Sequence, residues 1–156
     1  MAFVWQGQGA LRMPKGIMGL VSMAMLLLCC GQAAYAQESL VLIANPSTSP
    51  VNMTRETVRA IFAMRQRTLP SGEAAHVFVL PDKHPLHERF TKEILGVYPH
   101  QLRLSWDRLV FSGTGQAPNE VGSVEEMRQR VASTPGGLGY LNKGAVDDSV
   151  SVFSVE

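Results

Sequence analysis

The feature of this sequence that most restricts its fold is an alternation of short apolar runs with helical patterns. Runs rich in β-forming residues occur at 39–44, 76–80 and 138–141, and residues 150–155 alternate as a further strand. Between them, apolar residues recur three and four positions apart in segments that begin at Thr54, Pro85, Pro99 and Ser123. The resulting order, β-α-β-α-α-α-β-β, predicts an α/β domain with a small, mostly parallel sheet flanked by helices.

The first 36 residues differ in composition from the rest of the chain, because they contain no acidic residue and a long uncharged run. Their charges are Arg12 and Lys15, an uncharged run of 15 residues follows at 16–30, and small residues stand at Ala34 and Ala36. A positive start, an apolar stretch and an A-x-A sequence are typical of a secretory signal peptide. We therefore expect residues 1–36 to be cleaved after Ala36 and residues 37–156 to act as one periplasmic domain.

Two alternative interpretations of this leader, a membrane anchor and a lipoprotein signal, are less favoured. As a membrane anchor, its apolar run of 15 residues is shorter than the roughly 20 residues that span hydrocarbon. Lipid attachment would need a small residue before the modified cysteine, whereas Leu28 precedes Cys29, and Cys29 precedes Cys30. Cleavage by the ordinary signal peptidase is the favoured interpretation.

Removal of the leader changes the chemistry that the chain can perform. Both cysteines lie in the leader, so residues 37–156 contain no disulfide and no thiolate ligand. Of the 14 basic residues, two are in the leader, and the remaining 12 face 13 acidic residues, for a net charge of −1. This balance argues against nucleic acid as a partner, because nucleic-acid binders usually carry a basic surplus.

The candidate binding site lies where the predicted strands end. Ligands of open α/β sheets bind beyond the carboxyl ends of the strands, which here are followed by residues 45–49 and 81–86. A helix that starts at Pro85 would direct backbone N–H groups at this region, and helix N-termini attract anions. His84 and His87 could share a face of that helix. Two histidines are too few for a zinc site, so cap or surface histidines are favoured and no metal is expected.

No motif in the sequence supports catalysis. The chain has no G-x-S-x-G elbow for a serine nucleophile, and residues 112–115 lack the spacing and the lysine of a phosphate loop. The Gly-Leu-Gly at 137–139 lacks the third glycine of a dinucleotide-binding sequence. The acidic pairs at 125–126 and 147–148 fit a helix start and a turn. We expect neither catalytic residues nor a cofactor.

Three stretches carry a resemblance to a known family. They are VLIANPSTSPVNMTRETVRAIFAMRQRTLPSG, VFVLPDKHPLHERFTKEILG and WDRLVFSGTGQAPNEVGSVEEMRQRVASTPGGLGYL. Together they resemble the phosphate-binding, substrate-binding proteins of bacterial ABC transporters, and above all a group of short single-domain relatives. The most specific matches are to the family patterns lt...vr.IF.g....W.dG, at residues 54–72, and TPGaIGY, at residues 134–140.

The resemblance implies a periplasmic-binding-protein-like fold, in which two α/β lobes close on phosphate. Residues 37–156 are long enough for one lobe. The family pattern R-P-x-G-S-G-T-R-E-x-F holds phosphate through its arginine, serine and threonine. Aligned on Pro81 and Phe90, the pattern places Leu80, His84 and Leu86 at these three positions. The phosphate-binding side chains of the family therefore do not carry over to this chain.

Two hypotheses follow for the function. The first is an exported, non-enzymatic, substrate-binding-like domain, related to the binding components of phosphate ABC transporters, that binds a small anion weakly. Its candidate ligand-binding residues are Asn45, Lys83, His84, Leu86 and His87, with Lys83 and His84 as the side-chain donors. The second is a ligand-free interaction module on the same fold that contacts an envelope or membrane transporter protein.

Overall fold

The computed structural model describes residues 38–49 and 52–156, and the predicted leader with its cleavage site lies outside these residues. The described elements follow the chain in this order: β1 (Leu40–Ala44), α2 (Arg55–Phe62), β2 (His76–Val79), α3 (Pro85–Arg89), the π-helix η2 (Phe90–Leu95), α4 (Pro99–Phe111), β3 (Asn119–Glu120), α5 (Val124–Ser133), β4 (Gly137–Asn142), the 3-10 turn η3 (Lys143–Ala145) and β5 (Ser151–Phe153). None of the described helices is long and apolar enough to cross a membrane.

The sheet confirms the α/β class, and its strand directions are mixed. Its order is β3-β2-β4-β1-β5. β2 pairs in parallel with β3 and β4, whereas β1 pairs antiparallel with β4 and β5. Half of the pairings are therefore parallel, where the sequence predicted a mostly parallel sheet. The reason for the difference is that an apolar run indicates a buried strand but carries no information on the direction in which it runs.

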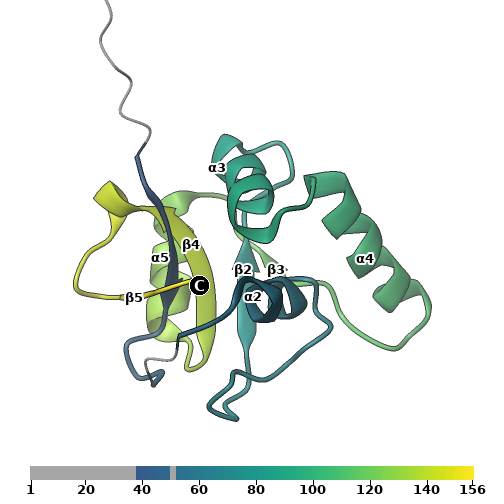
Figure 1. The fold of residues 1–156 in the computed structure, drawn as a ribbon, viewed down its shortest axis with the longest axis horizontal. Coiled ribbons are helices and arrows are strands. Elements are labelled where there is room, and N and C mark those ends of the chain that lie inside the picture. Colours follow the sequence, from purple (N-terminus) through teal and green to yellow (C-terminus); the bar gives the residue numbers. More distant parts are fainter. Residues whose placement is uncertain (1–37, 50–51) are drawn as a thin grey trace, which may run out of the picture. The chain divides into compact units, whose positions relative to one another are not determined.

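The reversed direction of β1 separates the two loops that were expected to form one site. Ala44, at the end of β1, pairs with Leu138, and Leu138 also pairs with Val77, at the start of β2. The carboxyl end of β1 therefore lies beside the amino end of β2. Residues 45–49 and 81–86 leave the sheet at opposite ends, as Figure 1 shows, and the prediction that both loops line one site is wrong.

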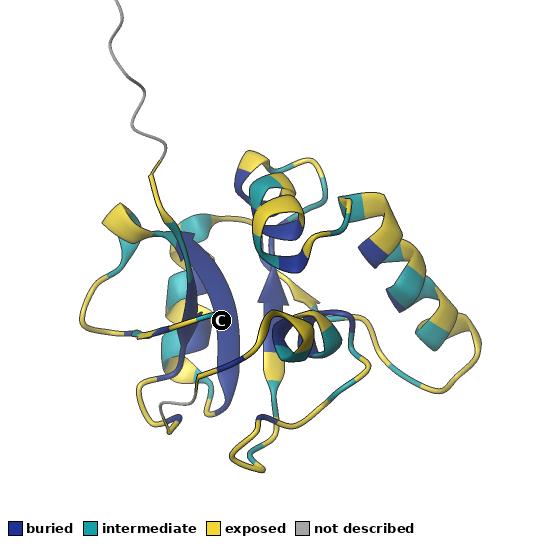
Figure 2. Ribbon diagram, viewed as in Figure 1, coloured by how far each residue is buried: buried dark blue, intermediate teal, exposed yellow. Residues whose placement is uncertain are grey.

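Helices cover both faces of the sheet. Successive residues of β4 point to opposite sides and therefore contact different helices. On one side, Gly139 leaves room for α5, whose Met127 and Val131 atoms approach to 3.0 Å from the position that a Cβ would occupy. On the other side, the ring of Tyr140 stacks on Phe90 of η2, with ring centroids 3.9 Å apart. Figure 2 shows the buried strands between these helical layers.

The helices begin as their sequence signals predict. Thr54 caps α2 by accepting a hydrogen bond from the N–H of Thr57, and α2 buries Val58, Ile61 and Phe62. Ser123 caps α5 in the same way through the N–H of Glu126. The helix that begins at Pro85 continues through η2 and ends at Gly96, whose φ of 66° is a left-handed conformation that suits glycine.

α4 departs from its predicted packing. The helical pattern that begins at Pro99 predicts four apolar residues on one face, namely Leu102, Trp106, Leu109 and Val110. Leu102 and Trp106 are buried, and the Trp106 indole donates a hydrogen bond to the carbonyl of Phe62. Val110, however, is 48% exposed. Fewer of the apolar residues of α4 are buried against the domain than the sequence pattern predicts. Part of the helix surface is therefore both apolar and exposed to solvent.

Gly136 offers a direct test of how the chain enters β4. Its φ is 68°, and a Cβ at this position would lie 2.0 Å from the carbonyl oxygen of Ala74. We expect Gly136→Ala to lower the free energy of unfolding by more than the roughly 1–2 kcal/mol that a left-handed backbone alone costs a residue with a Cβ. Urea denaturation of the purified variant measures the loss.

The matched control is Gly113→Ala. Gly113 has a φ of 69° and open space around the position of a Cβ. This variant should therefore show only the backbone contribution of about 1–2 kcal/mol. Equal losses in the two variants would contradict the steric role assigned to the carbonyl of Ala74.

Candidate functional site

The loop that follows β2 ends in a side-chain cap on α3. The Nδ1 atom of His84 accepts a hydrogen bond from the N–H of Leu86 at 3.2 Å, and the N–H of His84 donates to the carbonyl of Pro81 at 2.8 Å. Pro85 follows at the first helical position, which needs no N–H. Because Nδ1 acts as an acceptor, a neutral His84 carries its proton on Nε2. Lys83, beside it, is exposed.

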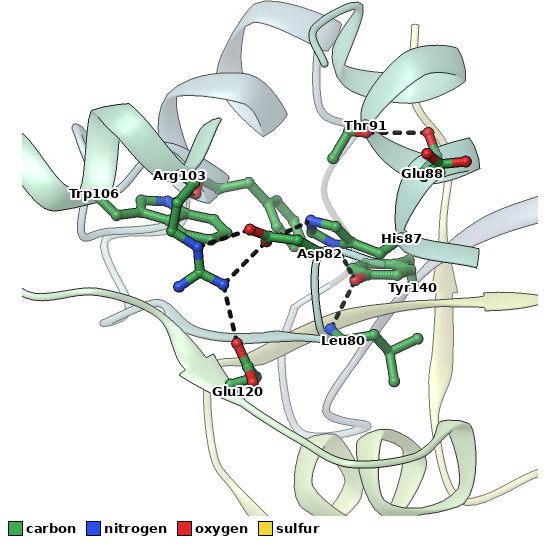
Figure 3. A network of polar contacts seen from close by, with 10 residues as sticks. Leu80, Asp82, His87, Glu88, Thr91, Arg103, Trp106, Glu120 and Tyr140 are labelled. Atoms are coloured by element: carbon green, nitrogen blue, oxygen red, sulfur yellow. Dashed lines mark hydrogen bonds and ion pairs between the residues drawn. The ribbon is translucent and has the colours of Figure 1, made fainter. Parts of the chain in front are cut away.

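Beneath this loop, His87 is fully buried and bound to Tyr140 (Figure 3). The Tyr140 Oη atom accepts a hydrogen bond from the N–H of Leu80 at 2.8 Å and lies 2.5 Å from His87 Nδ1. Because the tyrosine oxygen already accepts from Leu80, we assign its O–H as the donor to Nδ1 of His87. The second ring nitrogen of His87, Nε2, then carries the imidazole proton.

Nε2 of His87 is buried and forms no hydrogen bond with any of the described residues. The Oδ1 atom of Asp82 lies 3.9 Å from it, beyond hydrogen-bond length. Burial lowers the pKa of His87 below its ordinary value of 6.5, and the carboxylate of Asp82 partly opposes this effect. His87 is therefore a neutral, structural histidine at pH 7.

The carboxylate of Asp82 is held by Arg103 of α4. Two hydrogen bonds of 3.0 Å join the Arg103 guanidinium to both oxygens of Asp82, and a third of 3.0 Å reaches Glu120 of β3. The guanidinium carbon also lies 5.1 Å from the centre of the Trp106 ring. These hydrogen bonds raise the pKa of Arg103. One guanidinium thus faces two carboxylates, and the cluster has a net charge of −1.

The structure brings together only part of the predicted ligand set. Lys83 and His84 are neighbours on the surface, whereas Leu86 and His87 turn their side chains into the core. The N–H of Leu86 is engaged by His84. Asn45 lies at the other end of the sheet, where its Nδ2 donates to two carbonyls of α5 and its Oδ1 accepts from the N–H of Ser47. Asn45 therefore ties a loop to α5 and does not share a site with the others.

The sequence interpretation missed the polar network around Asp82. Tyr140 was assigned to a strand, and its hydroxyl was a signal that went unused, because a buried tyrosine O–H needs a partner. Asp82 lies inside the predicted loop 81–86 but was not singled out. Arg103 stands on a helix far along the chain, and only the tertiary fold brings it to the loop. Among the described residues, no three His, Cys, Asp or Glu side chains are placed to hold a metal ion.

The architecture defines an α/β lobe with helices on both faces of a mixed sheet and with its polar loop at the carboxyl end of β2. Solved phosphate-binding proteins contain such a lobe. The matches include an ABC-type phosphate transport receptor from Vibrio cholerae, at 16% identity and a TM-score of 0.59, covering 76% of this chain and 46% of that one. PstS from Borrelia burgdorferi matches at 15% identity and a TM-score of 0.57, over 76% of this chain and 47% of that one.

A further match is a Clostridium perfringens protein described as a phosphate ABC transporter substrate-binding protein, whose crystal structure contains bound phosphate. Its identity is 17% and its TM-score 0.61, over 76% of this chain and 45% of that one. This chain thus spans less than half the length of the solved structures it matches. No family model and no curated protein matches the sequence. At these identities the likeness establishes the fold, which is that of part of a phosphate-binding protein.

The buried His87 makes the stability of the domain depend on pH. Because its pKa is lower in the folded chain than its ordinary value of 6.5, the unfolded chain takes up a proton that the folded chain refuses. The free energy of unfolding should therefore decrease as the pH falls through and below about 6.5. Urea denaturation at a series of pH values between about 8 and 5 measures this dependence.

His87→Asn removes the titrating ring while keeping a hydrogen-bonding group near Tyr140, and it should flatten the dependence in this range. His100→Asn, which replaces an exposed histidine of α4, is the control and should leave the dependence in place. An unchanged slope in His87→Asn would contradict the role assigned to this histidine.

Proposed function

We propose that this chain is an exported, non-enzymatic binding domain of the substrate-binding-protein kind, and that its loop 81–86 holds a small anion such as phosphate weakly. The lobe-like fold shared with phosphate-binding proteins supports this proposal. The observation that carries it is the position of Lys83 and His84, two adjacent donors beyond the carboxyl end of β2 and at the start of a helical segment that runs through residues 85–95. By the same likeness, an ABC-type membrane transporter is the proposed partner.

The chemistry of this loop suits an anion through two groups. Lys83 contributes an exposed ammonium group. The cap that His84 forms with Leu86 uses Nδ1 as the acceptor, so the N–H at Nε2, which binds none of the described residues, can donate. The partial positive charge at the start of the helix adds to both.

Three features of the loop and its surroundings limit the affinity. Pro85 has no N–H, and the N–H of Leu86 is already bound by His84. The cluster of Asp82, Arg103 and Glu120 has one more negative than positive charge, which repels an anion. We therefore expect a dissociation constant near 1 mM, about −4 kcal/mol, and a further loss of affinity as salt screens the lysine charge.

Isothermal titration calorimetry of residues 37–156 with phosphate, and with sulfate for comparison, tests the proposal. Lys83→Ala should weaken phosphate binding several-fold, because it removes the full positive charge of the loop. Lys143→Ala removes an equal charge from an exposed position beyond β4 and should bind as the unaltered domain does. Equal binding by all three proteins would remove Lys83 from the site.

The second candidate is a ligand-free interaction module on the same fold. The observation that favours it is that the polar groups of the strand end are engaged with one another: Arg103 by two carboxylates, and the α3 cap by His84. A domain of this kind would contact an envelope or membrane protein. Absence of any binding heat with phosphate and sulfate would favour this candidate over the first.

Export is testable separately from ligand binding. The proposed signal peptide spans residues 1–36, and its removal would leave Gln37 as the first residue. Expression of the full chain in a Gram-negative host, followed by mass spectrometry of the periplasmic fraction, should give a protein that starts at Gln37. Replacement of Ala34 and Ala36 by Leu should block processing, since the peptidase accepts only small residues there. A full-length or lipid-modified product would contradict cleavage after Ala36.

A further inference from the structure

We propose that the outer face of α4 pairs with the same face of a second copy of this chain. The face consists of Leu104, Asp107, Arg108 and Phe111, here called the α4 row. These residues are spaced by three or four positions, so they lie along one side of the helix. The inference does not depend on whether the loop 81–86 binds an anion, because the α4 row is formed by other residues.

The α4 row places two large apolar side chains, those of Leu104 and Phe111, in contact with solvent. The opposite side of α4 already rests on the domain through the buried residues Leu102 and Trp106. The row nevertheless exposes 51% of Leu104 and 89% of Phe111. Figure 2 shows α4 at the margin of the domain, with its outer side exposed. A helix with apolar residues on both sides is expected to have a partner on each.

The arrangement of the row makes it complementary to itself. If two copies of α4 cross antiparallel about a two-fold axis between Asp107 and Arg108, Leu104 of each copy faces Phe111 of the other. The same axis places Asp107 of each copy opposite Arg108 of the other. Such a contact uses one surface on both partners, as a symmetric dimer requires. Apolar contacts at both ends then enclose two ion pairs at the centre.

The charges at the centre of the row are available for this pairing. Within the described part of the chain, the side chains of Asp107 and Arg108 form no ion pair or hydrogen bond with another side chain. Each would gain a partner of opposite charge in the antiparallel arrangement. A partner of another kind would have to supply the same order of apolar, basic, acidic and apolar groups, which a second copy supplies by symmetry.

The surface beside the row is hollowed. An open depression of about 830 Å³ is lined by Leu104, Arg108 and Phe111 of α4 and by Arg65. Phe111 of the second copy would enter this depression next to Leu104, with the Arg65 guanidinium near its ring. A contact made mainly by one 13-residue helix is smaller than the roughly 1,200 Å² of a standard interface. The dimer is therefore weak and forms at high protein concentration.

Sedimentation equilibrium of residues 37–156, over concentrations from about 10 μM to about 1 mM, tests the pairing. We expect a monomer at the low end and a dimer at the high end. Phe111→Ser should raise the dissociation constant at least about tenfold, because the two-fold axis makes it remove an aromatic contact at both ends of the pairing. Val110→Ser is the matched control, because Val110 is also apolar, 48% exposed and on α4, but outside the row. It should dimerise as the unaltered protein does.

The charge pair allows a sharper test. Asp107→Arg alone places like charges opposite each other and should weaken the dimer, and Arg108→Asp alone should do the same. The double variant Asp107→Arg/Arg108→Asp exchanges the two charges and should restore dimerisation, since each copy again presents an acid to a base. Circular dichroism confirms that all variants are folded.

A monomer at every concentration, or a double variant no stronger than the single ones, would overturn the pairing. Phosphate titration of the Phe111→Ser monomer separates this inference from the proposed function. Unchanged phosphate binding by that monomer, together with loss of the dimer, supports the α4 pairing. A dimer that persists in Phe111→Ser overturns it, whatever the phosphate result.

Discussion

The contacts of one tyrosine hold the polar end of this domain together. Tyr140 is fully buried in the central strand β4, and its ring stacks on Phe90. Its hydroxyl accepts the N–H of Leu80 and donates to His87, so β4, the end of β2 and the start of α3 meet at one oxygen atom. Burial raises the pKa of this hydroxyl well above its usual value, so it stays a donor. A phenylalanine here would leave two buried polar groups unpaired, at about 1–3 kcal/mol each.

This buried junction also explains the electrostatic character of the candidate site. His87 is hydrogen-bonded to Tyr140 and is kept neutral by burial, so it cannot offer a positive charge to a ligand. Above it, Asp82 is bound by Arg103, which Glu120 also contacts. The two groups near the loop that could bind an anion are therefore already hydrogen-bonded within the protein: Arg103 to two carboxylates, and the N–H of Leu86 to His84. Lys83 and His84 remain as candidate donors to an anion. Because both lie at the surface, where water competes for the anion, they support only weak binding.

The similarity in fold is therefore stronger evidence about the architecture of this domain than about its ligand. The lobe matches parts of solved phosphate-binding proteins, yet the chain spans less than half of their length. Binding between two lobes encloses a ligand and excludes water, which strengthens each charged hydrogen bond. The lobe-like fold therefore does not by itself decide whether this domain binds an anion or a protein partner.

The sequence by itself determined the local elements, because strand runs, helix periodicity and caps depend on neighbouring residues. Thr54, Pro85, Gly96 and Ser123 mark helix ends as their signals predict. β3 and η3 escaped prediction, because two or three residues carry no periodicity.

Only the tertiary structure decided the direction of β1, and with it the separation of Asn45 from the loop 81–86. It likewise decided that Arg103 reaches Asp82 across 21 positions of sequence and that His87 meets Tyr140 across 53. The physical reason is that pairing direction and long-range polar contacts arise from packing between elements, which no local pattern of residues encodes.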